Sequence, residues 1–226
     1  MKILALTTST DHGSIALSTS ENKLFKKNWT RNKQHSEVLT SHIQKLFKLA
    51  KLQPKELDAI AVDRGPGSFT GCRIAVNVAK TMSFALKIPI YCESSLALMA
   101  TKMASTHRGP IIALLDAHKS LYYIQTFKSD GTRLIESSVS IQALPFERIF
   151  KNLSKDLLVV GEISNIGDYS MAIKTPKKKT DNFPSAMTLL TMALQNFDKK
   201  NKYQDWPLVE PAYIRNPNVL ENIPKK

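Results

Sequence analysis

The chain has 226 residues, a formal net charge of +13 and a hydrophobic content of 42%. This length allows one large domain or two small domains with proper cores, and no apolar run approaches the roughly 20 residues that a membrane-spanning helix needs. The excess of lysine and arginine is spread over both halves of the chain, so it raises non-specific affinity for nucleic acid without specifying a site.

The first half of the chain begins with short apolar runs joined by tight turns, which is typical of an antiparallel meander. From Gln34 the apolar residues recur at helical spacing, and shorter apolar and helical segments then alternate. The expected elements are strands at Ile3–Thr8, Gly13–Ser18, Lys23–Trp29, Leu57–Val62 and Ile90–Cys92, and helices that end near Ala50, Leu86 and Ala104.

After a joint at Thr106–Pro110 the pattern restarts. The expected elements are strands at Ile111–Asp116, Leu121–Phe127, Leu134–Val139 and Leu157–Val160, and helices at Ala143–Asn152 and Pro184–Phe197. This order predicts an α/β fold with two related β-β-β-α-β-α halves. We expect an N-terminal subdomain at 1–105 and a degenerate C-terminal subdomain at 106–205, with the segment from about 206 to 226 packing back on the first subdomain.

The loop Gly65–Gly71 and the helix that follows it, up to Leu86, form the most distinctive stretch. Glycines allow a sharp turn and a close approach to another surface, and Thr70, or failing it Ser68, is expected to cap the helix. The start of the helix favours anions through its free N–H groups and its dipole. The residues of a candidate nucleotide or anion site are therefore Gly65, Gly67, Ser68, Thr70, Gly71, Arg73 and Asp116.

Known catalytic loops do not match this stretch. A Walker A loop needs a lysine and a hydroxyl residue directly after its last glycine, whereas Gly71 is followed by Cys72 and Arg73. Ser68 does not lie in a G-x-S-x-G nucleophile elbow, so a turn or capping role is favoured. Asp63 closes an apolar strand, and we favour a turn carboxylate there over a ligand-binding one.

The sequence also favours no metal site. His35 and His42 are seven residues apart, which separates them by about 10.5 Å along a helix, too far to share one ion. Cys72 and Cys92 lie in apolar segments without metal-type spacing, which indicates a reduced, cytoplasmic chain. We expect no catalytic residue, no metal and no cofactor of its own.

The two helices that end near Ala50 and Leu86 carry more apolar surface than one sheet-packing stripe needs. This surplus suggests a helix-pair interface of about 800 Å² per partner, although packing of all these side chains in the core is the alternative. The expected interface residues are Val38, Leu39, His42, Ile43, Leu46, Ile74, Ala75, Val78, Ala79 and Met82.

Six stretches carry a resemblance to a known family: ILALTTST, HSEVL, GPGSFTGCRIAV, AKTMSFALKIPIYCESSLALMA, LLDAHKSLYY and PAYIR. Over nearly its whole length the chain resembles the bacterial TsaB (YeaZ) family. The resemblance implies an actin-like, sugar-kinase/Hsp70-type ATPase fold. It also implies a role in making N6-threonylcarbamoyladenosine at position 37 of tRNAs that read ANN codons.

In that family the related subunit TsaD carries the metal and transfers the threonylcarbamoyl group, and TsaE supplies an ATPase. TsaB is the inactive relative that pairs with TsaD through its first two helices, which here correspond to Ser36–Ala50 and Gly71–Leu86. Three departures agree with a partner rather than a catalyst. Thr7 stands where relatives often have an aspartate, Gly161-Glu162-Ile163-Ser164 replaces a Gly-Asp-Gly-Ala run, and Leu39 follows His35 where the catalytic relative has a second metal ligand.

The first hypothesis is therefore a non-catalytic scaffold subunit that supports a TsaD-like partner in a heterodimer, contacts tRNA only through the complex, and forms a homodimer when alone. A nucleotide at the heterodimer junction is a further expectation. The second hypothesis is an independent ATPase or kinase-like enzyme that uses the crevice between the halves. The third is a direct tRNA-binding protein that uses Lys174–Lys179 and Lys199–Lys202.

Overall fold

The structure, a computed structural model, describes residues 1–20, 23–30, 35–149, 156–161, 174–199 and 202–214. Its first sheet has six strands in the order β10-β5-β4-β1-β2-β3. Their bounds are β1 (Ile3–Thr7), β2 (His12–Ser18), β3 (Leu24–Thr30), β4 (Ala59–Asp63), β5 (Ile90–Glu93) and β10 (Tyr203–Gln204). β2 is antiparallel to both β1 and β3, whereas β4 runs parallel to β1. The predicted antiparallel meander of the first three strands is confirmed, and the structure shows in addition that the next strand pairs parallel to β1.

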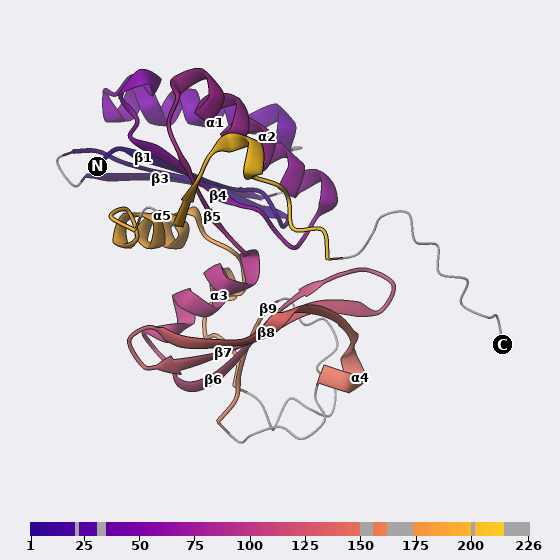
Figure 1. The fold of residues 1–226 in the computed structure, drawn as a ribbon. Helices are drawn as coiled ribbons and strands as arrows, with labels where there is room; N and C mark the ends of the chain where they lie inside the picture. Colours follow the sequence, from indigo (N-terminus) through magenta and orange to yellow (C-terminus); the bar gives the residue numbers. More distant parts are fainter. Residues whose placement is uncertain (21–22, 31–34, 150–155, 162–173, 200–201, 215–226) are drawn as a thin grey trace.

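Helices cover both faces of this sheet because β1 buries side chains on both sides. They are α1 (His35–Ala50), α2 (Phe69–Leu86) and α5 (Ala186–Gln195). Leu4 and Leu6 belong to the apolar cluster under α1 and α2, and Ile3 and Ala5 belong to the cluster that α5 completes. Figure 1 shows α1 and α2 above the sheet and α5 below it. Within the described part of the chain, no helix is both long and apolar enough to cross a lipid bilayer.

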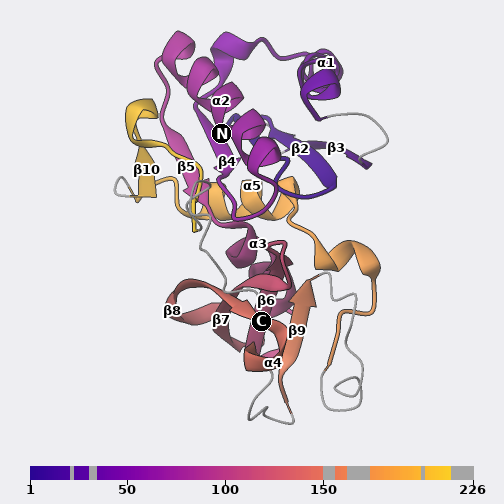
Figure 2. The same ribbon diagram turned by 90° about the vertical axis from the view of Figure 1, so that its right-hand side faces the viewer.

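The second half repeats this plan beyond α3 (Ser95–Ala104) (Figure 2). Its sheet has the order β8-β7-β6-β9, and β6 is antiparallel to β7 and parallel to β9, as β1 is to β2 and β4. The bounds are β6 (Arg108–Asp116), β7 (Leu121–Asp130), β8 (Leu134–Pro145), α4 (Phe146–Ile149) and β9 (Leu158–Gly161). The two related halves predicted from the order of elements are therefore present.

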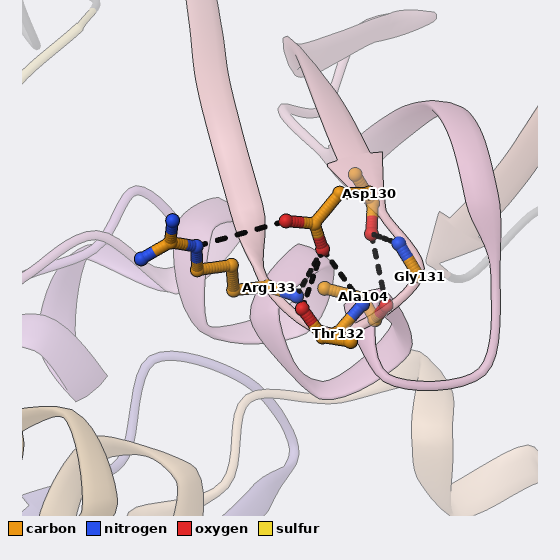
Figure 3. Close-up of polar contacts among 6 residues, drawn as sticks. Ala104, Asp130, Gly131, Thr132 and Arg133 are labelled. Atoms are coloured by element: carbon orange, nitrogen blue, oxygen red, sulfur yellow. Dashed lines mark hydrogen bonds and ion pairs between the residues drawn. The ribbon is translucent and has the colours of Figure 1, made fainter.

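The β7–β8 turn is fastened to the end of α3 (Figure 3). Ser129 Oγ donates to the Ala104 carbonyl over 2.8 Å and accepts from the Gly131 N–H over 3.0 Å. The Asp130 carboxylate accepts from the Thr132 hydroxyl and from the N–H groups of Arg133 and Thr132, and these bonds lower the pKa of Asp130 to about 2. The long hairpin is thus held against the helix that connects the two halves.

The return of the chain to the first half differs from the prediction. The expected second subdomain extended to residue 205, but α5 packs on the first sheet and β10 pairs with β5 of that sheet. Apolar side chains of α5 cause this placement, because Leu189 and Leu190 are fully buried under β1 and β4. Short 3-10 helices lie at η1 (Pro54–Glu56), η3 (Lys179–Asn182) and η5 (Trp206–Leu208).

Two elements of the second half also differ from the prediction. β8 continues to Pro145 instead of ending near Val139, so the helix expected at Ala143–Asn152 begins only at Phe146, as α4, and 150–155 lie outside the described residues. In the run from Gly161 to Ser164 only Gly161 is described. A Cβ on Gly161 would overlap the Leu114 carbonyl oxygen, so this glycine permits the close pairing of β9 with β6.

Because α5 supplies part of the first core, we expect Leu190→Ala to lower the free energy of unfolding by about 2–5 kcal/mol. Leu190 is 1% exposed, whereas the adjacent Thr191 is exposed. Thr191→Ala is therefore the matched control and is expected to change stability by about 0.5 kcal/mol or less. Urea unfolding of the full chain measures both, and equal midpoints for the two variants would contradict the placement of α5.

Candidate functional site

The Gly65–Gly71 loop, which joins β4 to α2 and includes the first three residues of that helix, is packed against the end of β1. The Ser68 N–H donates to the Ser9 carbonyl over 2.7 Å, and Thr8 Oγ1 donates to the Gly71 carbonyl over 2.7 Å. A Cβ on Gly67 would overlap the Ser9 carbonyl oxygen, and one on Gly71 would overlap that of Thr8. These glycines therefore permit a close approach of two segments of the chain itself.

Ser68, and not Thr70, caps α2. Ser68 Oγ accepts from the Gly71 N–H over 3.2 Å, while Thr70 lies one residue inside the helix and is exposed. The preference for Thr70 is wrong because α2 begins at Phe69, which makes Ser68 the residue before its first turn. The first hydroxyl of the stretch, that of Ser68, thus satisfies a free N–H group at the start of α2.

Asp63, at the end of β4, is the centre of the polar cluster beneath this loop. Its carboxylate is fully buried and accepts from Thr7 Oγ1 over 2.8 Å, Ser9 Oγ over 2.5 Å, Ser95 Oγ over 2.6 Å and the Gly65 N–H over 2.9 Å. Burial raises the pKa of Asp63, and these four donors oppose the rise. The sequence interpretation of a turn carboxylate accounts only for the Gly65 bond.

Thr7, Ser9 and Ser95 were not expected to act together, yet the sequence holds a signal for them. β1, β4 and β5 run parallel, so the residues that follow these strands meet at one edge of the sheet. Each strand ends in or is followed by hydroxyl residues or an acid: Thr7 ends β1 and Ser9 follows it, Asp63 ends β4, and Ser95 follows β5. The three hydroxyls donate hydrogen bonds to the buried carboxylate of Asp63, so at this edge of the sheet they are engaged within the chain.

The other residues of the candidate anion site are used within the protein. Arg73 Nε donates to the Tyr213 hydroxyl over 2.8 Å, and its guanidinium carbon lies 3.9 Å from the centroid of the Phe69 ring. Asp116 is exposed and accepts from the His118 N–H over 2.7 Å in its own turn. Among the described residues, no group of three or more His, Cys, Asp or Glu side chains is close enough to hold a metal ion.

The structure divides the expected interface residues into two groups. Six of them are buried: Val38, Leu39, Ile43, Leu46, Ala75 and Ala79. All but Val38 belong to the core cluster between the helices and the first sheet. Their assignment to an interface is corrected, because buried side chains are not available to a partner. His42 packs against Trp29 of β3, with ring centroids 4.9 Å apart, and is therefore occupied on the β3 side of α1.

The remaining three of the expected interface residues lie at the surface of α2. Ile74, Val78 and Met82 recur every four residues, so they form one row along the helix. All three are half-buried and pack against the core cluster from its edge. Exposed Asn77 and Thr81 lie beside the row. A partner helix laid along this row would complete the burial of three apolar side chains without breaking an internal contact.

Known proteins match the chain over most of its length. The family model described as "TsaD: tRNA N6-adenosine threonylcarbamoyltransferase" matches residues 30–197. The tRNA threonylcarbamoyladenosine biosynthesis protein TsaB of Buchnera aphidicola subsp. Schizaphis graminum is 31% identical over 166 residues, which cover 71% of this chain and 78% of the relative. TsaB of Haemophilus influenzae is 27% identical over 236 residues, covering 99% of this chain and 98% of the relative.

A solved structure agrees with these matches. It is described as an uncharacterized protein with similarity to peptidase YeaZ, from Pseudomonas aeruginosa. It superposes with a TM-score of 0.80 at 26% identity and covers 95% of this chain and 99% of that chain. The likeness therefore includes both sheets and the elements that join them.

The cap of α2 gives a first test of the loop. Ser68→Ala removes the side-chain acceptor for the Gly71 N–H, so it is expected to lower the free energy of unfolding by about 1 kcal/mol. Thr70→Ala, in the first turn of α2, is the control, and it is expected to leave stability nearly unchanged. Thermal unfolding of both variants measures the difference. A larger loss of stability for Thr70→Ala than for Ser68→Ala would contradict the assignment of Ser68 as the cap.

Asp63 gives a second test, through pH. Its raised pKa means that the folded chain keeps this proton at pH values where the unfolded chain, with a pKa of about 3.9, has lost it. The stabilisation from this group is therefore present at low pH and decreases as pH rises through the folded pKa. Asp63→Asn does not titrate there, so the unfolding free energy of wild type minus that of Asp63→Asn should fall as pH rises above about 4. A difference that is constant or grows with pH would contradict the direction of the shift.

Proposed function

The chain belongs to the TsaB (YeaZ) family and has its actin-like fold, and we propose that it acts in the biosynthesis of N6-threonylcarbamoyladenosine in tRNA. In this proposal it is a non-catalytic subunit that pairs with a TsaD-like catalytic subunit. The observation that carries the pairing is the half-buried apolar row Ile74, Val78 and Met82 on α2. A second helix is the natural occupant of such a row, because it buries side chains at the same four-residue spacing.

The edge of the first sheet supports a partner role over an independent ATPase. The glycines of the Gly65–Gly71 loop approach the carbonyls of Thr8 and Ser9, and the hydroxyl of Thr7 is bonded to Asp63. Groups that could hold a nucleotide and its metal are thus engaged in contacts within the chain. A nucleotide at the heterodimer junction and a TsaE-like ATPase as a further partner stay predictions from the family.

The solved neighbour is described as similar to a peptidase, but the contacts of Ser68 give no support for a peptidase activity of this chain. Its hydroxyl oxygen accepts from the Gly71 N–H, which is the geometry of a helix cap. A serine nucleophile needs a general base within hydrogen-bond reach of its hydroxyl. The polar contacts of Ser68 are instead made with backbone groups of its own loop and of Ser9.

The pairing is tested by a charge placed in the apolar row. Val78→Asp is expected to weaken binding to a purified TsaD-like subunit at least about tenfold, because an unpaired carboxylate would be buried at the contact. Thr191→Asp is the matched control, since it adds the same charge to an exposed helix position on the opposite face of the sheet. Titration calorimetry measures both affinities, and circular dichroism checks that both variants fold.

Cells that lack this gene provide the functional readout. Complementation with Thr191→Asp should restore the modified nucleoside to the wild-type level, and complementation with Val78→Asp should not. Normal binding and normal modification with Val78→Asp would remove the α2 row as the partner surface. Tight binding and turnover of Mg-ATP by the isolated chain would instead favour the independent enzyme.

A further inference from the structure

The opposite flank of α2 carries a set of exposed aromatic rings. Every exposed large aromatic side chain among the described residues lies here: Phe69 (42% exposed), Phe84 (64%), Trp206 (38%) and Tyr213 (45%). Phe69 and Phe84 come from α2, and Trp206 and Tyr213 come from the C-terminal segment that crosses beside it. Exposed apolar side chains scattered singly are ordinary, but several exposed rings along one flank of a helix mark an interaction surface.

Helical spacing places basic residues in the same row. Phe69 and Arg73 are four residues apart, as are Lys80 and Phe84, and the two pairs are separated by eleven residues, or about three turns. All four side chains therefore lie on one flank of α2. We call this surface the aromatic-basic flank, and it consists of Phe69, Arg73, Lys80, Phe84, Lys87, Trp206 and Tyr213.

Rings and cations meet at both ends of this flank. At the start of α2, the Arg73 guanidinium carbon lies 3.9 Å from the Phe69 centroid and 5.7 Å from the Tyr213 centroid. Near the end of the helix, the Phe84 and Trp206 centroids are 5.2 Å apart and Lys80 Nζ lies 5.9 Å from the Trp206 centroid. Each cluster thus joins a flat surface with a positive charge.

A groove opens at the second cluster. It has a volume of about 450 Å³ and is lined by Phe84, Lys87, Asp205 and Trp206 together with small and apolar neighbours. The aromatic rings provide stacking faces, Lys87 is a donor and Asp205 is an acceptor. This combination of flat apolar faces with a donor and an acceptor at the edge matches a nucleobase.

The C-terminal segment is held in place independently of these rings. Val209 is 1% exposed in the core cluster, and the Ala212 N–H donates to the Arg64 carbonyl over 2.7 Å. The segment therefore stays beside α2 without needing the rings of Trp206 and Tyr213 to be buried. Their exposure is not explained by attachment of the segment.

We infer that the aromatic-basic flank binds single-stranded RNA, with unpaired bases stacking on its rings and on the Arg73 guanidinium. Proteins recognise unpaired bases by stacking them on aromatic side chains and arginine planes, and basic residues follow the phosphates. The choice of RNA as occupant rests on the proposed function, whose substrate is tRNA. This flank is favoured over the lysine run at Lys174–Lys179, where Lys174 is already paired with Asp156 over 3.0 Å.

The test uses the full chain and a fluorescent hairpin with the sequence of an unmodified anticodon stem–loop, with the fully paired duplex of the same stem as comparison. The wild-type chain is expected to bind the hairpin more tightly than the duplex. Trp206→Leu and Tyr213→Leu should each weaken hairpin binding by about 5-fold to 150-fold, as loss of one stacked base implies. Lys80→Ala should reduce the salt dependence of binding by about one counterion.

Controls separate stacking from charge and from fold. Tyr213→Phe keeps the ring and loses only the bond to Arg73 Nε, so hairpin affinity should be unchanged. Leu49→Ala and Lys48→Ala remove an exposed apolar side chain and an exposed charge from α1, and neither should alter the affinity. Equal affinity for hairpin and duplex, loss with the α1 controls, or no binding by a folded wild-type chain would overturn the inference. Pairing with the TsaD-like subunit is measured separately, so either proposal can fail while the other stands.

Discussion

The buried carboxylate of Asp63 is the interaction on which the arrangement of the first half depends. It ends β4 and accepts from Thr7 at the end of β1, from Ser9 beyond that end, from the loop that leads into α2 and from the first residue of α3. A buried carboxyl group is costly unless hydrogen-bond partners satisfy its oxygens. The need to keep Thr7, Ser9, Gly65 and Ser95 within reach therefore fixes the ends of three parallel strands and the starts of two helices together.

The position of α2 follows from this cluster. Gly65 bonds to Asp63, Ser68 bonds to the Ser9 carbonyl, and Gly71 accepts from Thr8, so this stretch is attached to the ends of both β4 and β1. The first turn of α2 consequently has little freedom to tilt. Surfaces on this helix are presented in a defined orientation, which is the condition for recognising a partner at low entropic cost.

The sequence predicts the fold well because the signals are long and mutually consistent. Apolar runs such as Ile3–Thr8 and the helical period of α1 identify the elements, and their order identifies the repeat. The site was less predictable because helical spacing does not say which side of a helix meets the sheet: Leu39 and Ile43 are core residues, whereas Val78 remains at the surface. The Asp63 cluster and the aromatic-basic flank were missed for another reason. Each joins residues far apart in the chain, as Arg73 and Tyr213 do.

The two proposed surfaces of α2 are compatible because they lie on different flanks. Val78 and Arg73 are five residues apart, which rotates their side chains by about 140° around the helix axis. A partner that covers Ile74, Val78 and Met82 would therefore leave Arg73 and Phe84 open. The contacts around Asp63 fix α2 to the sheet. The helix would therefore hold RNA on one flank in a constant orientation relative to a subunit bound on the other flank. In a non-catalytic subunit, such positioning is a contribution to the reaction that requires no reactive group of its own.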